Sequence, residues 1–177
     1  MSQQIITRVL ERVDEIIIAA MNQEVIAGLA VGIIQGDRLI YSKGFGFADI
    51  QQQKEITADT VFRIGSISKT FTAIAIMQLW EQGKFQLDDS INKYLKAYQV
   101  KHRDPNAPPV TFRHLLTHTS GIGEVRKFTD LLLTVWGLGG KPDKPIPSLK
   151  EYYSEGITPE VYPNTKWAYA NHGFATL

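Results

Sequence analysis

Ser66 and Lys69 stand three positions apart at the start of a long apolar stretch, and together they could form an activated nucleophile. Residues three apart on a helix project from the same face, so the hydroxyl and the amine would lie within reach of each other. A serine hydroxyl is a poor nucleophile until a base removes its proton, and a lysine desolvated beside it can act as that base. Ser66 also follows Gly65 in the expected first turn, where free N–H groups and the helix dipole favour negative charge. The pair therefore predicts a catalytic serine.

The same pair also has a structural interpretation, in which Ser66 is an ordinary N-cap residue. The position of Lys69 weighs against it. A charged amine that opens a buried helix costs several kcal/mol unless it has a partner or a function, and Lys is among the residues least often fully buried. We therefore favour chemistry over capping.

Tyr169 and Asn171 form a second polar pair near the end of the chain. A phenol can act as a base when a neighbouring cation lowers its pKa, and an Asn side chain can hold an amide or ester group. The alternative is a Tyr packed in the core and an Asn that caps a turn. Residues 162–164 repeat the Tyr-x-Asn pattern, and because Pro–Asn is a natural turn pair we interpret that copy as a turn.

Two elements precede Ser66. Residues 3–22 place apolar side chains at helical spacing, which predicts an amphipathic helix. The pattern over 27–48 is typical of a β-hairpin that turns at 35–37. A lone hairpin is marginally stable in water, so it needs partner strands, and no strong candidate follows. We expect residues 1–65 to form the helix and hairpin of an α/β lobe.

The stretch 71–82 is apolar on nearly every side and ends at Gly83, which is typical of a helix in the middle of a protein. Shorter helical candidates follow, separated by Pro- and Gly-rich connections, at 89–97, 111–118, 128–136 and 148–155. We expect residues 66–177 to form a mostly helical lobe that carries both polar pairs.

Composition limits the classes of function. The chain has 177 residues, 44% of them hydrophobic and 21% charged, with a net charge of +1 and no cysteine. The small charge and the lack of a Lys/Arg block predict no nucleic-acid partner, and no apolar run is long enough to span a membrane. Disulfides, thiolate metal sites and cysteine nucleophiles are excluded. Residues 1–20 lack the core of an export signal, so we expect a cytoplasmic protein.

Two further patterns resemble ligand-binding motifs, one for a metal ion and one for a phosphate group, but both lack required residues. His114 and His118 have a metal-compatible spacing, but no acidic residue follows His114 as in a zinc-protease helix, so we favour a packed helix end and expect no metal. The glycine-rich segment 137–142 lacks the first Gly of a phosphate loop, and Pro142 replaces the Ser or Thr that holds magnesium. We expect no cofactor.

Four blocks of sequence, taken in order, resemble the serine β-lactamase-like superfamily, and most closely its class C β-lactamase, DD-peptidase and esterase branch. They are Phe62–Thr72, Leu87–Ile91, Val110–Ile122 and Pro163–Asn171. The resemblance extends from about residue 26 to the C-terminus. Four linked blocks in order are far more specific than any one of them.

This resemblance implies an α+β fold, in which a helical lobe faces an incomplete antiparallel sheet lobe and the site lies between them. It also implies that Ser66 attacks a carbonyl to give an acyl-enzyme, and that the Ser66 N–H supplies half of an oxyanion hole. Lys69 and Tyr169 would move the proton, and which of them is the base stays open. Asn171 would position the substrate, a small amide or ester such as a β-lactam, a D-amino-acid peptide or a carboxylic ester.

Two departures from the family pattern matter. Asn164 stands where the family usually has Gly, a mild change because Asn tolerates left-handed conformations. The family's third motif, a Lys/His-Thr/Ser/x-Gly strand, should follow well after Asn171, yet the sequence stops at Leu177. We therefore expect an N-terminal portion of a longer enzyme, with self-association through the unpaired sheet edge. The alternative is a truncated or non-catalytic member that binds acyl-peptide-like ligands or a partner chain without turnover.

Overall fold

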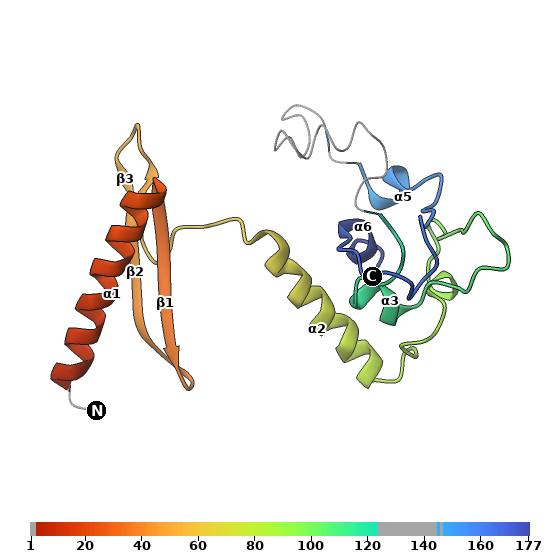
Figure 1. The fold of residues 1–177 in the computed structure, drawn as a ribbon, viewed down its shortest axis with the longest axis horizontal. Coiled ribbons are helices and arrows are strands. Elements are labelled where there is room, and N and C mark those ends of the chain that lie inside the picture. Colours follow the sequence, from red (N-terminus) through yellow and green to blue (C-terminus); the bar gives the residue numbers. More distant parts are fainter. Residues whose placement is uncertain (1–2, 124–144, 146) are drawn as a thin grey trace. The chain divides into compact units, whose positions relative to one another are not determined.

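The computed structural model describes residues 3–123, 145 and 147–177 (Figure 1). The chain divides into two units, Met1–Arg63 and Ile64–Leu177. The helix predicted at 128–136 and the glycine-rich segment 137–142 lie outside the described residues. Within the described part of the chain, no helix combines the length and the apolar character needed to cross a bilayer.

The first unit pairs a long helix with an antiparallel sheet. Helix α1 (Gln3–Glu24) confirms the helix predicted over 3–22. Strands β1 (Gly28–Gln35) and β2 (Arg38–Asp49) form the predicted hairpin. Gly36 has φ +64° in the turn between them, a conformation that a glycine adopts without steric cost.

A short third strand, β3 (Lys54–Glu55), pairs with β2 and gives the sheet order β1-β2-β3. This strand was not predicted, because it lies in a polar stretch without alternating apolar residues. The backbone at Ile56, just after β3, packs closely against Gly44. A Cβ at Gly44 would lie 2.1 Å from the Ile56 carbonyl oxygen, so glycine permits this approach. On α1, Asp14 accepts a hydrogen bond from the hydroxyl of Tyr41 in β2, and burial together with this bond raises the pKa of Tyr41 to about 12.

The second unit combines helices, most of them short, with loops that make up most of its described residues, around a hydrophobic core. Its described helices are η1 (Gly65–Ile67), α2 (Ser68–Glu81), η2 (Ile91–Lys93), α3 (Phe112–Leu116), α5 (Leu149–Tyr152) and α6 (Asn171–Phe174). The core consists of buried apolar side chains from these helices and the loops between them: Ile76, Phe85, Ile91, Tyr98, Val100, Val110, Phe112, Leu115, Ile122, Tyr153 and Ile157. Helices and a small antiparallel sheet together give the predicted α+β class.

The prediction of a helix over 89–97 was wrong, because only the 3-10 turn η2 forms there. The Asn92 side chain exchanges hydrogen bonds with the Val100 backbone at 2.7 and 2.8 Å, which holds the following residues in a loop. At the start of the turn, Asp89 accepts a hydrogen bond from Lys93 at 2.7 Å. The Lys93 ammonium, aided by the Gln86 N–H, lowers the pKa of Asp89 to about 2.

The other two predicted helices that lie in the described part of the chain, α3 and α5, form where predicted but end earlier. At α3 the Thr111 side chain caps the first turn, and the helix ends before His118, whose φ of +59° cannot continue an α-helix. At α5 the Ser148 side chain and Glu151 form a capping box, and only one helical turn follows. Both N-termini are thus set by local capping residues.

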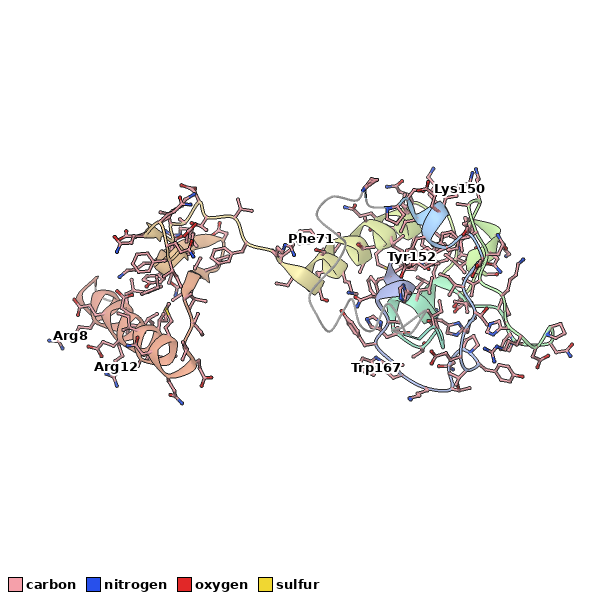
Figure 2. The ribbon with its side chains drawn as sticks, turned by 90° about the horizontal axis from the view of Figure 1, so that it is seen from above. Arg8, Arg12, Phe71, Lys150, Tyr152 and Trp167 are labelled. Atoms are coloured by element: carbon pink, nitrogen blue, oxygen red, sulfur yellow. The ribbon has the colours of Figure 1, made fainter. Side chains whose placement is uncertain are left out.

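Helix α2 differs most from its prediction. We expected it in the middle of the protein, but only Ile76 of its residues is buried. Phe71 is 64% exposed and Ile74 52% exposed, and Figure 2 shows the Phe71 side chain on this helix. The reason is that the core of its own unit covers only the side of the helix that carries Ile76. A helix that is apolar on all sides is expected to be buried, but its sequence does not identify the segments that pack against it. The predicted stop at Gly83 is confirmed by its φ of +69°.

Candidate active site

Ser66 lies in the first turn of the continuous helical segment η1–α2, and Lys69 lies one turn later. Gly65 precedes Ser66 with φ +52°, which turns the chain sharply into this segment. The Lys69 ammonium donates a hydrogen bond to Ser66 Oγ at 3.2 Å. The spacing that the sequence displays therefore becomes a direct contact between the two side chains.

Tyr169 and Asn171 reach the same place from the far end of the chain. Tyr169 Oη lies 2.6 Å from Ser66 Oγ, and Lys69 Nζ donates a hydrogen bond to Asn171 Oδ1. Lys69 Nζ also lies 4.8 Å from the centroid of the Tyr169 ring. All four predicted site residues thus form one hydrogen-bonded cluster, which lies wholly within the unit Ile64–Leu177.

The segment that carries Tyr169 is held by the residues that follow α3. The carbonyl oxygen of Thr119 accepts the Asn164 N–H at 2.7 Å, and that of Gly121 accepts the Glu160 N–H at 2.8 Å. Gly121 has φ +74°, and a Cβ there would lie 2.1 Å from the Val161 carbonyl oxygen. Only glycine allows the two segments to approach this closely.

The second Tyr-x-Asn copy lies outside the cluster. Asn164 has φ +63° and the Thr165 N–H bonds the Tyr162 carbonyl oxygen, so the predicted turn is confirmed. The Tyr162 hydroxyl donates to the carboxylate of Asp104, and this bond lowers the pKa of Asp104. A left-handed Asn164 in place of the usual Gly is therefore accommodated.

Two aromatic rings of the site were not assigned to it from the sequence. The Phe174 ring centroid lies 5.9 Å from Lys69 Nζ, and the His118 ring centroid lies 4.6 Å from that of Tyr169. In the sequence, His118 was considered with His114 as a possible metal ligand. The signal that could have assigned it to this site was its position in the block Val110–Ile122. Such contacts depend on the packing of distant segments and leave no local pattern.

The two histidines do not face one ligand. His114 Nδ1 accepts the Thr111 N–H at 3.2 Å as part of the α3 capping box, and burial is the main cause that lowers the pKa of His114. His118 Nδ1 accepts the Ala170 N–H at 3.1 Å. Across the described residues, no group of three or more His, Cys, Asp or Glu side chains could hold a metal ion.

The cluster has the parts that acyl transfer requires at an accessible oxygen. Ser66 is exposed, and its Oγ contacts both an amine and a phenol that can exchange protons with it. The Lys69 ammonium favours negative charge on both neighbouring oxygens. The arrangement can therefore activate a hydroxyl for attack on a carbonyl.

Comparison with known proteins gives concordant matches. A family model described as Beta-lactamase matches residues 13–177. The mitochondrial serine β-lactamase-like protein LACTB of Bos taurus is 37% identical over 100 residues, which cover 56% of this chain and 18% of that protein. Esterase EstB of Burkholderia gladioli is 30% identical over 112 residues, which cover 63% of this chain and 29% of that protein.

A solved structure extends the similarity over most of the chain. The octameric penicillin-binding protein homologue from Pyrococcus abyssi superposes with a TM-score of 0.76 at 31% identity, covering 94% of this chain and 37% of that one. The region similar to these proteins is therefore less than half of each of them.

Proposed function

Because the chain belongs to the β-lactamase family, we propose that it is a serine hydrolase that forms an acyl-enzyme on Ser66. The observation that carries this proposal is the double contact at one oxygen: Tyr169 Oη at 2.6 Å and Lys69 Nζ at 3.2 Å from Ser66 Oγ. An ordinary N-cap serine would bond the backbone of its own helix and would need neither partner.

The reaction proceeds in two steps, acylation of Ser66 and hydrolysis of the acyl-enzyme. One member of the Tyr169–Lys69 pair must be deprotonated before the reaction: either Lys69 is a neutral amine, or Tyr169 is a phenolate beside the Lys69 ammonium. That group takes the Ser66 hydroxyl proton as Oγ bonds to the carbonyl carbon of the substrate. The same proton goes to the departing nitrogen or oxygen as its bond to that carbon breaks, which leaves an ester on Ser66. Water then gives a proton to the pair and attacks the ester, and Ser66 Oγ departs with that proton.

The proposed substrate is a small amide or ester: a β-lactam, a D-amino-acid peptide or a carboxylic ester. Relatives named as an esterase and as a penicillin-binding protein homologue support both chemical classes. Asn171, which the Lys69 ammonium holds beside the nucleophile, is proposed to position the reacting group. The acylation step is the same for all three substrates, and the shape of the pocket selects among them.

Intact mass spectrometry tests the acyl-enzyme directly. The chain is incubated with a fluorophosphonate, which loses fluoride as phosphorus bonds to a nucleophilic oxygen, and separately with a β-lactam. We expect one adduct, mapped to Ser66 and absent from Ser66→Ala. The matched control is Ser68→Ala, which removes an exposed hydroxyl at the start of the same helix and should leave labelling unchanged. Absence of an adduct on the unmodified chain would refute the proposal.

Turnover separates an enzyme from a family member that only binds. Hydrolysis of nitrocefin or of a p-nitrophenyl ester by the chain, lost in Ser66→Ala, is the expected result. Binding of these compounds with neither an adduct on Ser66 nor release of product would instead identify a non-catalytic member that binds acyl-peptide-like ligands.

A further inference from the structure

We propose that His118 is a positioning residue, which fixes the backbone on both sides of Tyr169 and so sets the distance between the phenol and Ser66. The inference rests on the proposed function, because it concerns the group that exchanges a proton with the nucleophile. His118 lies just after α3, in a loop that is distant in sequence from the residues it holds.

His118 makes two hydrogen bonds that flank Tyr169. Its carbonyl oxygen accepts the Ala168 N–H at 2.9 Å, and its ring Nδ1 accepts the Ala170 N–H at 3.1 Å. Ala170 is only 1% exposed, so water cannot replace the ring as the partner of that amide. The backbone on both sides of the phenol is thereby tied to a single residue.

The imidazole ring also packs on the aromatic side chains of the site. Its centroid lies 4.6 Å from that of Tyr169, with the rings inclined by 31°, and 5.0 Å from that of Phe174. Phe174 in turn contributes its ring to the surroundings of Lys69. The His118 ring therefore contacts Tyr169 directly and approaches Lys69 only through Phe174.

The hydrogen bond defines the protonation of the ring. Because Nδ1 accepts from the Ala170 amide, the ring proton of the neutral imidazole lies on Nε2. The backbone of His118 has φ +59°, a conformation that costs free energy for most residues but that His and Asn adopt more readily than others. Asn is accordingly the conservative replacement, since its Oδ1 can accept in place of Nδ1.

Two variants separate the acceptor from the ring. His118→Phe keeps a ring against Tyr169 and removes the acceptor, whereas His118→Asn keeps an acceptor and removes the ring. We expect His118→Phe to slow phosphonylation of Ser66 at saturating fluorophosphonate by about tenfold or more, because a buried amide loses its partner beside Tyr169 and because Phe adopts φ +59° less readily than His or Asn. The half-saturating concentration should stay the same, and His118→Asn should recover most of the rate.

The matched control is His114→Gln, on the preceding helix. His114 also accepts a backbone N–H through Nδ1, but that bond caps α3, so this variant should label at the rate of the unmodified chain. If His118→Phe does not fold, long-range proton–nitrogen NMR on the unmodified chain decides instead. A proton on Nδ1 of His118 would overturn the proposal, and a proton on Nε2 supports it.

The outcomes distinguish the two proposals. If the unmodified chain is labelled on Ser66 and His118→Phe is labelled equally fast, the positioning role is wrong and the proposed function stands. If slowing in His118→Phe is not relieved in His118→Asn, the acceptor is not the cause and the proposal is again overturned. If the unmodified chain takes no label, the proposed function fails and His118 has no reaction to serve.

Discussion

Replacement of Tyr169 by Phe removes a single oxygen from the site and keeps the ring. Tyr169 Oη lies closer to Ser66 Oγ than Lys69 Nζ does, at 2.6 Å against 3.2 Å. The ring contacts with His118 and the ammonium of Lys69 depend on the aromatic face, which Phe retains. The variant therefore tests proton transfer with little change in packing.

The expected effect on rate is large and the expected effect on stability is small. A positioned acid–base group accelerates a reaction by roughly 100- to 10,000-fold, which corresponds to about 3–5 kcal/mol in the barrier. Tyr169 is 37% exposed, so loss of its hydroxyl should change the free energy of unfolding by no more than about 0.5 kcal/mol. Phosphonylation of Ser66 should slow by at least about 100-fold.

The assay is time-resolved labelling with a fluorophosphonate, read by intact mass, beside a urea denaturation curve. Tyr162→Phe is the matched control, because it removes the hydroxyl of the second Tyr-x-Asn copy, which bonds Asp104. That control should label at the normal rate. If Tyr169→Phe labels within threefold of the unmodified chain, on the order of 0.6 kcal/mol, the phenol is not the proton-transfer group and the reasoning from the 2.6 Å contact is refuted.

Three further predictions concern stability. Gly65→Ala should cost about 1–2 kcal/mol, measured by urea denaturation, because φ is +52° while no atom lies within 4 Å to obstruct a Cβ; an unchanged midpoint would contradict this. Leu115→Ala should cost about 3–4 kcal/mol in the same assay, since Leu115 is fully buried in the core, and a loss below about 1 kcal/mol would argue against that packing. His114 should make stability depend on pH: its folded pKa is lowered from 6.5, so the unfolded chain binds the extra proton and stability falls as pH drops below about 6.5. His114→Gln, which keeps an acceptor for the capping box, should flatten that part of the profile, while the separate loss from Asp89 between pH 3.8 and about 2 should remain.

Local features of the fold were predictable because their causes are local. Helical spacing over 3–22 and the turn at Gly36 depend on neighbouring residues, and so does the one-turn separation of Ser66 and Lys69. The turn at Asn164 follows from Pro–Asn chemistry in the same way. In each case the residues that determine the structure lie within a few positions of one another.

Other features depend on what packs against them. Helix α2 is apolar all round, yet its exposure depends on neighbours that the residue pattern does not specify. Tyr169 contacts Ser66 in a fold where the backbone of Gly121 packs closely against Val161. No local pattern in either segment predicts this close packing. Tyr169 was assigned to the site through resemblance of ordered blocks, and His118 was interpreted instead as part of a packed helix end.

The contact between Ser66 and Tyr169 joins residues 103 positions apart, and this separation bears on how the chain folds. Closing so long a loop costs about 4 kcal/mol of chain entropy, whereas one exposed hydrogen bond returns only about 1 kcal/mol. The site cannot nucleate its own formation, so the interior of the unit must condense first. A newly synthesised or refolding chain would therefore carry a chemically ordinary serine until the final stage of folding, and reactivity toward a phosphonate would report completion of that stage.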